Sequence, residues 1–169
     1  ITEEGLAKDL VELLKKTIQA GKRVHFMGLL SDGGVHSHIE HLEALLDFAC
    51  KIGHDKVSLH LFMDGRDTPP DSGIGYIASL LPHSAINTGK AQIASISGRY
   101  YAMDRDQRWD RVEKAYLAMT GQTSESKEKN PVQILKTSYQ KKITDEFIEP
   151  TCLNPSSCIQ DGDSILFFN

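Results

Sequence analysis

The sequence lacks long apolar runs and an excess of positive charge. None of its 169 residues belongs to an apolar stretch of about 18, the length of a membrane-spanning helix. The formal net charge is −4, whereas domains that bind nucleic acids usually carry a basic face. The first residues, Ile1–Glu4, have neither the basic nor the apolar part of a signal peptide. We therefore expect no membrane partner and no nucleic-acid partner.

Cysteine is also scarce. The three cysteines are Cys50, Cys152 and Cys158, an odd number without C-x-x-C spacing. This pattern excludes a disulfide framework and favours a reducing, cytoplasmic compartment. Ser31 does not lie in a G-x-S-x-G motif, which speaks against a serine hydrolase. The 40% hydrophobic and 25% charged residues are those of one ordinary globular domain.

The spacing of apolar residues predicts alternating helices and strands. We expect a mobile, polar loop over 121–129 and a helix after Asn130, whose side chain can cap it. Strands that alternate with helices predict a three-layer α/β/α domain with a mostly parallel sheet of about five strands. The predicted helices are 2–20, 37–52, 73–81, 108–119 and 131–141, and the predicted strands are 24–30, 57–63, 91–97, 146–148 and 165–168.

Unusual polar segments follow the first three predicted strands. They are residues 31–38, 64–71 and 98–106. If the strands are parallel, all three segments leave the sheet at one edge, where open α/β sheets bind ligands. We therefore expect the functional site there.

Arginine is concentrated in the second and third of these segments and just after them. Because guanidinium groups bind carboxylate and phosphate in pairs of hydrogen bonds, we infer a small ligand with more than one acidic group. The alternative is that the arginines form salt bridges with neighbouring aspartates. The spacing favours this alternative for Arg108 and Arg111, but not for Arg66 and Arg99, which follow strands and glycines. The six arginines are Arg23, Arg66, Arg99, Arg105, Arg108 and Arg111.

Asp67 and the histidines near position 36 are the other candidates. Asp67 follows Arg66 and can act as a base on a substrate hydroxyl, or merely hold an arginine in place. His36 can contact an anion. His38 can cap the helix that follows, although H-x-H spacing also suits a metal site completed by Asp32.

Taken together, these segments resemble the cofactor-independent (2,3-bisphosphoglycerate-independent) phosphoglycerate mutases. The resemblance is carried by LSDGGVHSH at 30–38, DGRDTPP at 64–70 and SGRYYAMDRD at 97–106, and DGD at 161–163 also matches. It covers nearly the whole chain. It implies that residues 1–169 are a single transferase, or substrate-binding, domain excised from a two-domain enzyme.

The resemblance also implies an activity. Such an enzyme interconverts 3-phosphoglycerate and 2-phosphoglycerate in glycolysis through a phosphoserine. The serine and two divalent metal ions, usually Mn²⁺, belong to a phosphatase-like domain that this chain does not contain. We therefore expect no metal in this chain, and the phosphatase-like domain as its partner.

Five residues match substrate-binding positions of that family. They are His36, Arg66, Asp67, Arg99 and Arg105, with Asp67 in the catalytic role of handling the hydroxyl proton. The family continues past the final Phe-Phe-Asn into further substrate-binding arginines, which are absent here. We therefore predict that the chain alone is inactive and binds phosphoglycerate weakly.

Two other classes of function remain open at this point. One is a stand-alone metal-dependent hydrolase that uses Asp32, His36, His38 and Asp67. The other is a non-catalytic module that captures an organic acid.

Overall fold

Three runs of buried residues form the centre of the sheet. The computed structural model describes residues 8–123 and 126–169. Strands β1 (Val24–Leu30), β2 (Val57–Met63) and β3 (Ala91–Gly98) lie side by side and are parallel. Every residue of β2 is buried, as expected for a parallel strand covered on both faces. The three strand predictions are confirmed.

Two short strands complete the sheet at its edges. Strand β5 (Ser164–Phe167) pairs in parallel with β1, and β4 (Thr151–Cys152) pairs antiparallel with β3. The order is β4-β3-β2-β1-β5. The mostly parallel five-stranded sheet is therefore confirmed, and so is the last predicted strand.

The strand predicted at 146–148 is wrong. Residues Asp145–Phe147 form a 3-10 turn, η1, and the fourth strand comes later, at 151–152. The turn is held from outside: the Asp145 amide donates to the Pro70 carbonyl at 2.8 Å, and the Asp145 carboxylate accepts from the Gly73 amide at 2.8 Å. A run of three residues, of which only Phe147 and Ile148 are apolar, is too short to distinguish a strand from a turn that packs against its neighbours.

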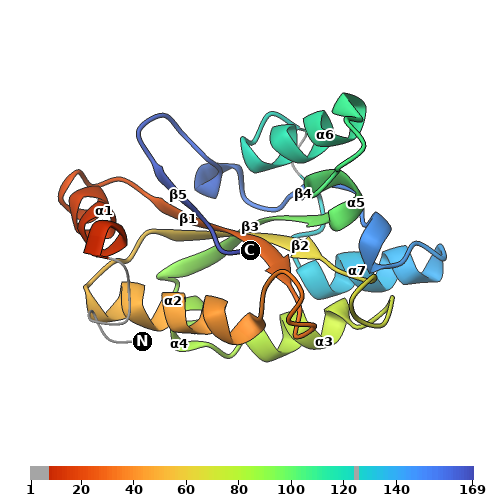
Figure 1. Cartoon of the computed structure of the whole chain (residues 1–169), viewed down its shortest axis with the longest axis horizontal. Helices are drawn as coiled ribbons and strands as arrows, with labels where there is room; N and C mark the ends of the chain where they lie inside the picture. Colours follow the sequence, from red (N-terminus) through yellow and green to blue (C-terminus); the bar gives the residue numbers. More distant parts are fainter. Residues whose placement is uncertain (1–7, 124–125) are drawn as a thin grey trace.

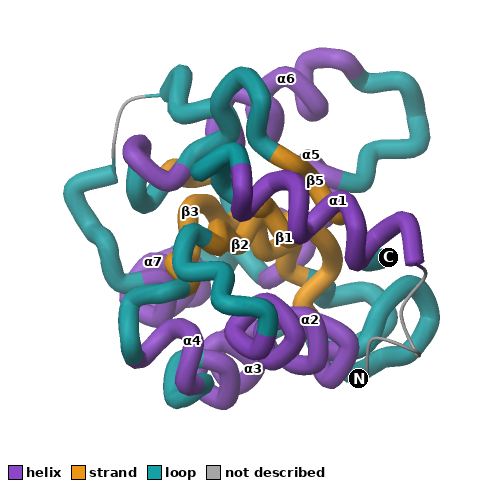
Figure 2. Tube along the Cα trace, turned by 90° about the vertical axis from the view of Figure 1, so that its left-hand side faces the viewer, coloured by secondary structure: helices purple, strands orange, loops and turns teal. Residues whose placement is uncertain are grey.

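The helices lie in two layers, one on each face of the sheet (Figures 1 and 2). A further 3-10 turn, η2, spans Pro155–Ser157. The helix predicted over 2–20 is described from Lys8 onward, and its first residues lie outside the described part. One layer holds α2 (Ile39–Lys51), α3 (Gly73–Leu80), α4 (Ser84–Asn87) and α7 (Pro131–Gln140), and the other holds α1 (Lys8–Gln19), α5 (Arg99–Ala102) and α6 (Trp109–Met119).

Local sequence explains where the helices begin. Asn130 accepts hydrogen bonds from the amides of Val132 and Gln133, and Pro131 occupies the first turn, where no amide is needed. His38 caps α2 by accepting from the Glu40 amide at 3.3 Å. None of the described helices combines the length and the apolar character needed to cross a membrane. The predicted loop over 121–129 includes residues 124–125, which lie outside the described residues.

A chain of buried polar side chains crosses the sheet. Ser95 Oγ lies 2.7 Å from His60 Nδ1, His60 Nε2 lies 2.9 Å from His25 Nδ1, and His25 Nε2 lies 3.1 Å from Asp163. Burial lowers the pKa of His60 to about 3, so the ring is neutral. Every group then has a partner if the Ser95 hydroxyl donates to His60, His60 donates to His25, and His25 donates to the Asp163 carboxylate.

Candidate functional site

The three polar segments do meet at one edge. Each lies at the carboxyl end of a parallel strand: residues 31–38 follow β1, 64–71 follow β2, and 98–106 begin at the last residue of β3. The three strands end in register, since Leu30 pairs with Met63 and Met63 with Gly98. The segments leave the sheet toward the right in Figure 1.

Asp64 organises the centre of this edge. It follows the buried strand β2 and is itself buried. One oxygen, Oδ1, accepts the amides of Arg66 and Asp67 at 3.1 Å each and Arg99 Nη1 at 2.7 Å. Burial alone would raise the pKa of Asp64, but these hydrogen bonds outweigh it and hold the pKa below its usual range. The salt-bridge alternative of the sequence analysis covers the pairing of Asp64 with an arginine, but not its hydrogen bonds to the amides of Arg66 and Asp67.

Arg99 is held between two carboxylates. Its side chain is buried, and Nη1 also lies 2.6 Å from Asp67 Oδ2. Although burial acts to lower the pKa of Arg99, the two carboxylates raise it, so the guanidinium is charged. The salt-bridge alternative therefore applies to Arg99 as well. Its Nε and Nη2 atoms have no protein partner within the described part of the chain.

His36 completes a connected group. Its Nε2 lies 4.0 Å from Asp67 Oδ2, and the ring is 44% exposed. Asp67 thus lies between an imidazole from the first segment and a guanidinium from the third. The structure brings together His36, Asp67 and Arg99, three of the five residues predicted from the sequence.

The other two predicted residues lie differently. Arg66 turns toward η1, where its Nε lies 2.5 Å from Glu146 Oε1. Arg105 is exposed in the turn between α5 and α6, and among the described residues no contact connects it with this group.

The salt bridges predicted for Arg108 and Arg111, just after the third segment, are confirmed. Arg108 pairs with Asp110, and Arg111 pairs with Asp104 and Asp106. The structure therefore places both in ion pairs with neighbouring aspartates.

The side chains considered for a metal site each contact a different partner. The His38 ring caps α2, Asp32 accepts a hydrogen bond from Tyr76 Oη at 2.5 Å, and Asp67 holds Arg99. Over residues 8–123 and 126–169, no group of three or more His, Cys, Asp or Glu side chains is placed to hold a metal ion. The described side chains do not fit a metal site.

The carboxylates of the site outnumber its guanidinium groups. Two guanidinium groups, those of Arg66 and Arg99, face three carboxylates, those of Asp64, Asp67 and Glu146. The edge therefore presents oriented donors without a net positive charge. A ligand with two acidic groups needs further cations before it binds tightly.

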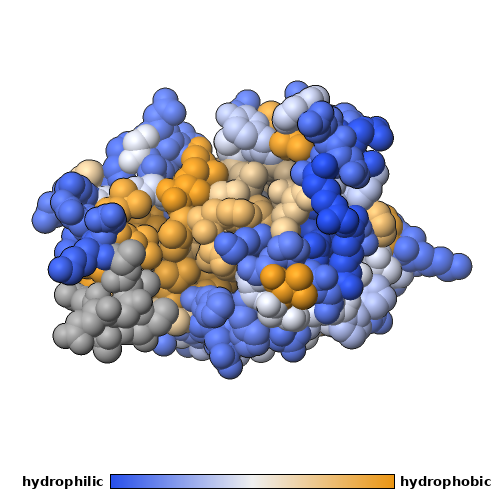
Figure 3. Space-filling view, viewed as in Figure 1, coloured by the Kyte–Doolittle hydropathy of each residue, from blue (hydrophilic) through white to orange (hydrophobic). Residues whose placement is uncertain are grey.

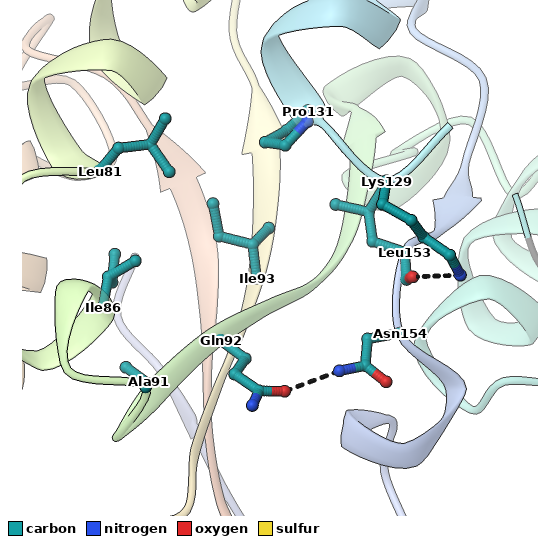
Figure 4. A pocket seen from close by; sticks show the side chains of 10 residues that line it. Leu81, Ile86, Ala91, Gln92, Ile93, Lys129, Pro131, Leu153 and Asn154 are labelled. Carbon is teal, nitrogen blue, oxygen red and sulfur yellow. Dashed lines mark hydrogen bonds between the residues drawn. The ribbon is translucent and has the colours of Figure 1, made fainter. Parts of the chain in front are cut away.

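A mainly apolar hollow lies elsewhere on the described surface. A cavity of about 480 Å³ lies near the amino-terminal end of β3 and is lined mainly by apolar side chains such as Leu81, Ile86 and Ile93 (Figure 4). Lys129, on its rim, donates to the Leu153 carbonyl at 2.8 Å. Between α1 and α6 the surface is apolar, whereas the end that carries the polar segments is largely hydrophilic (Figure 3). The polar edge is the better candidate for an anion site.

Comparison with known proteins decides the family. The family model described as "BPG-independent PGAM N-terminus" matches residues 4–169. The chain belongs to this family.

Curated relatives and a solved structure agree with this assignment. The 2,3-bisphosphoglycerate-independent phosphoglycerate mutase of Clostridium novyi (strain NT) is 49% identical over 169 residues, which covers 94% of this chain and 32% of that protein. The relative of the same name from Clostridium beijerinckii is 51% identical, with 92% of this chain and 30% of that protein covered. Leishmania mexicana phosphoglycerate mutase, solved at low cobalt concentration, superposes with a TM-score of 0.80 at 28% identity, over 94% of this chain and 34% of that one.

The chain therefore spans about a third of the length of the relatives it matches. The DGD motif at 161–163, which carried part of the resemblance, has a structural role in this member of the family. Asp163 accepts the amides of Arg23 and Gln160 at 3.0 Å each, in addition to the His25 ring. It fixes the loop that leads into β5.

Proposed function

We propose that this chain is the substrate-binding transferase domain of a longer cytoplasmic enzyme that interconverts 3-phosphoglycerate and 2-phosphoglycerate. Family membership and the names of the relatives support the reaction. The observation that carries the proposal for this chain is the group formed by His36, Asp67 and Arg99 at the sheet edge. The phosphatase-like domain that the resemblance implies is the partner of this edge.

In this proposal the remaining polypeptide supplies the phosphoryl-accepting serine and the two divalent ions, Mn²⁺ or similar. When bound, such ions stabilise the charge that develops during phosphoryl transfer. The residues of this chain hold and orient the glycerate. Positioning and charge stabilisation are the main requirements of this reaction, so a binding domain contributes directly to the rate.

Each residue has a role that follows from its free atoms. Arg99 directs Nε and Nη2 toward the acidic groups of the substrate, since Nη1 is already used by Asp64 and Asp67. Asp67 Oδ1, which accepts no hydrogen bond from the described residues, accepts the proton of a substrate hydroxyl. His36 and Arg66 hold the phosphate and carboxylate, and the exposed Arg105 completes the clamp.

Binding to the isolated chain tests the first part of the proposal. Calorimetry with 3-phosphoglycerate, glycerate and sulfate should show weak binding, because the edge carries no net positive charge. The affinity should be highest for 3-phosphoglycerate, and salt should lower it by screening the ion pairs with the ligand. Arg99→Met should abolish the heat, whereas Arg108→Met, which removes an arginine paired with Asp110, should leave it unchanged. Equal affinity for glycerate and 3-phosphoglycerate would instead indicate a module that captures organic acids.

Turnover tests the second part. In an assay coupled to enolase, the longer polypeptide should convert 3-phosphoglycerate, and the 169-residue chain should not. Asp67→Asn in the longer polypeptide should lower kcat by roughly 10²- to 10⁴-fold, the usual contribution of a general base. Normal turnover by the isolated chain would refute the proposal that the remaining polypeptide supplies the serine and the metal ions.

A further inference from the structure

The η1 turn packs against two of the segments that form the edge. Gly98, at the end of β3, donates its amide to the Ile148 carbonyl at 2.7 Å. A Cβ atom on Gly98 would lie 2.1 Å from the Glu146 carbonyl oxygen, and one on Gly65 would lie 2.9 Å from the Glu146 amide. Backbone-to-backbone packing this close is possible only because both positions are glycine. The backbone of Glu146 is therefore fixed relative to Arg66 and Arg99, which follow these glycines.

The neighbouring Asp145 anchors the same turn from its other side. Its carboxylate is buried and accepts hydrogen bonds from the Gly73 amide and from the Tyr139 hydroxyl. Its amide donates to Pro70, in the segment that carries Asp67. The turn thus has fixed contacts with the β2 and β3 segments and with α3.

The Glu146 side chain reaches from this fixed backbone to Arg66. Glu146 is 13% exposed and Arg66 is 42% exposed, so the carboxylate lies beneath the guanidinium. The contact uses Arg66 Nε only. Nη1 and Nη2, which have no partner in the described residues, are the pair of donors that a phosphate or carboxylate can accept from.

We propose that Glu146 is a positioning residue that holds the Arg66 guanidinium ready for an acidic group of the substrate. An unrestrained arginine loses side-chain entropy when it is ordered by a ligand. Glu146 removes part of this cost before binding. The inference rests on the proposed function, because it assigns the restrained arginine to the phosphoglycerate site.

The test compares two substitutions in the longer polypeptide. Glu146→Ala removes the acceptor, so KM for 3-phosphoglycerate should rise by between about 5- and 30-fold, with a smaller change in kcat. Glu146→Gln keeps an acceptor for Nε and should restore KM to within about threefold of the wild-type value. Glu149→Ala is the matched control, because it removes a carboxylate that is 60% exposed from the same segment and should leave KM unchanged.

Thermal unfolding of each variant separates positioning from folding. If Glu146→Ala leaves KM unchanged in folded protein, or lowers it, Glu146 does not position Arg66 and the inference is wrong. The same holds if Glu146→Gln is as impaired as Glu146→Ala. If the longer wild-type protein has no mutase activity, the proposed function fails on its own. Calorimetry of the chain with 3-phosphoglycerate still decides the role of Glu146, since Glu146→Ala must weaken that binding and Glu146→Gln must not.

Discussion

At the scale of single residues, Asp64 accepts three of the hydrogen bonds that hold the site together. It is a buried carboxylate that compensates a buried guanidinium and satisfies two amides with the same oxygen. Asp64→Asn should destabilise the chain by about 3 kcal/mol at pH 7, because Arg99 then keeps one of its two carboxylates. Urea unfolding measures this, and Asp71→Asn, in an exposed part of the same segment, should change stability by less than about 0.5 kcal/mol.

The pKa of Asp64 gives this prediction a pH dependence. The folded-state pKa is lowered from 3.8, so the unfolded chain takes up the proton first as the pH falls. The contribution of the Asp64 charge to the free energy of unfolding is therefore complete above pH 3.8. It is lost as the pH falls through the lower folded-state pKa. The stability difference between wild type and Asp64→Asn should shrink below about pH 4. A difference that stays constant from pH 7 to pH 2 would show that the charge of Asp64 is not what stabilises Arg99.

At the scale of secondary-structure elements, the buried histidines connect three strands to the β5 loop. His60 keeps a pKa of about 3 in the folded chain against 6.5 when exposed. The unfolded chain therefore binds the extra proton below pH 6.5, and stability should fall by up to about 1.4 kcal/mol per pH unit for this histidine between pH 6.5 and pH 3. His60→Gln should lower stability at pH 7 and flatten this slope in urea unfolding. Substitution of the exposed His41 by Gln should leave the slope unchanged.

Glycines test how closely η1 packs against β3. Gly98→Ala should destabilise the chain by about 1–3 kcal/mol, because the new Cβ would overlap backbone atoms of Glu146. Gly75→Ala is the opposite case: it lies in α3 with nothing within 4 Å of the new atom, and it should stabilise the chain by about 0.5–1 kcal/mol. Chemical denaturation of both variants checks the pair. A neutral Gly98→Ala would mean that the turn can move away without cost.

These elements also show what the sequence could and could not predict. The buried run of β2 and the capped start of α7 were predicted correctly, because each depends on residues close together in the chain. The η1 turn was not, because it depends on contacts with Pro70 and Gly73, more than 70 residues away. The sequence indicated Arg99 and Asp67 as neighbours of a ligand, and aspartates such as Asp64 as alternative partners of the arginines. It did not indicate Glu146, which lies 80 residues from Arg66 in the chain.

At the scale of the whole molecule, the thiols report whether the chain folds as a unit. Cys152 and Cys158 are buried with Sγ atoms 3.3 Å apart, and Cys158 also contacts the Ala118 carbonyl of α6. Burial, with the neighbouring Cys152 thiol, raises the pKa of Cys158 to about 12, so almost no reactive thiolate forms at neutral pH. Cys50 is only partly buried. An aromatic disulfide reagent should therefore label Cys50 first, and the other two at the rate of global unfolding.

The labelling rate also tests whether this chain folds and binds its substrate without the rest of the enzyme. The core formed by β1, β2, β3 and the α2 helix lies within this chain, so the protection of Cys152 and Cys158 should persist in the isolated 169 residues. Binding of 3-phosphoglycerate adds RT ln(1 + [L]/Kd) to stability, which is small while the ligand concentration is near Kd. Phosphoglycerate at low millimolar concentration should thus slow the labelling only slightly in the isolated chain, and strongly in the longer polypeptide. Equal protection in both would mean that the edge described here already binds its substrate fully, without cations from the rest of the protein.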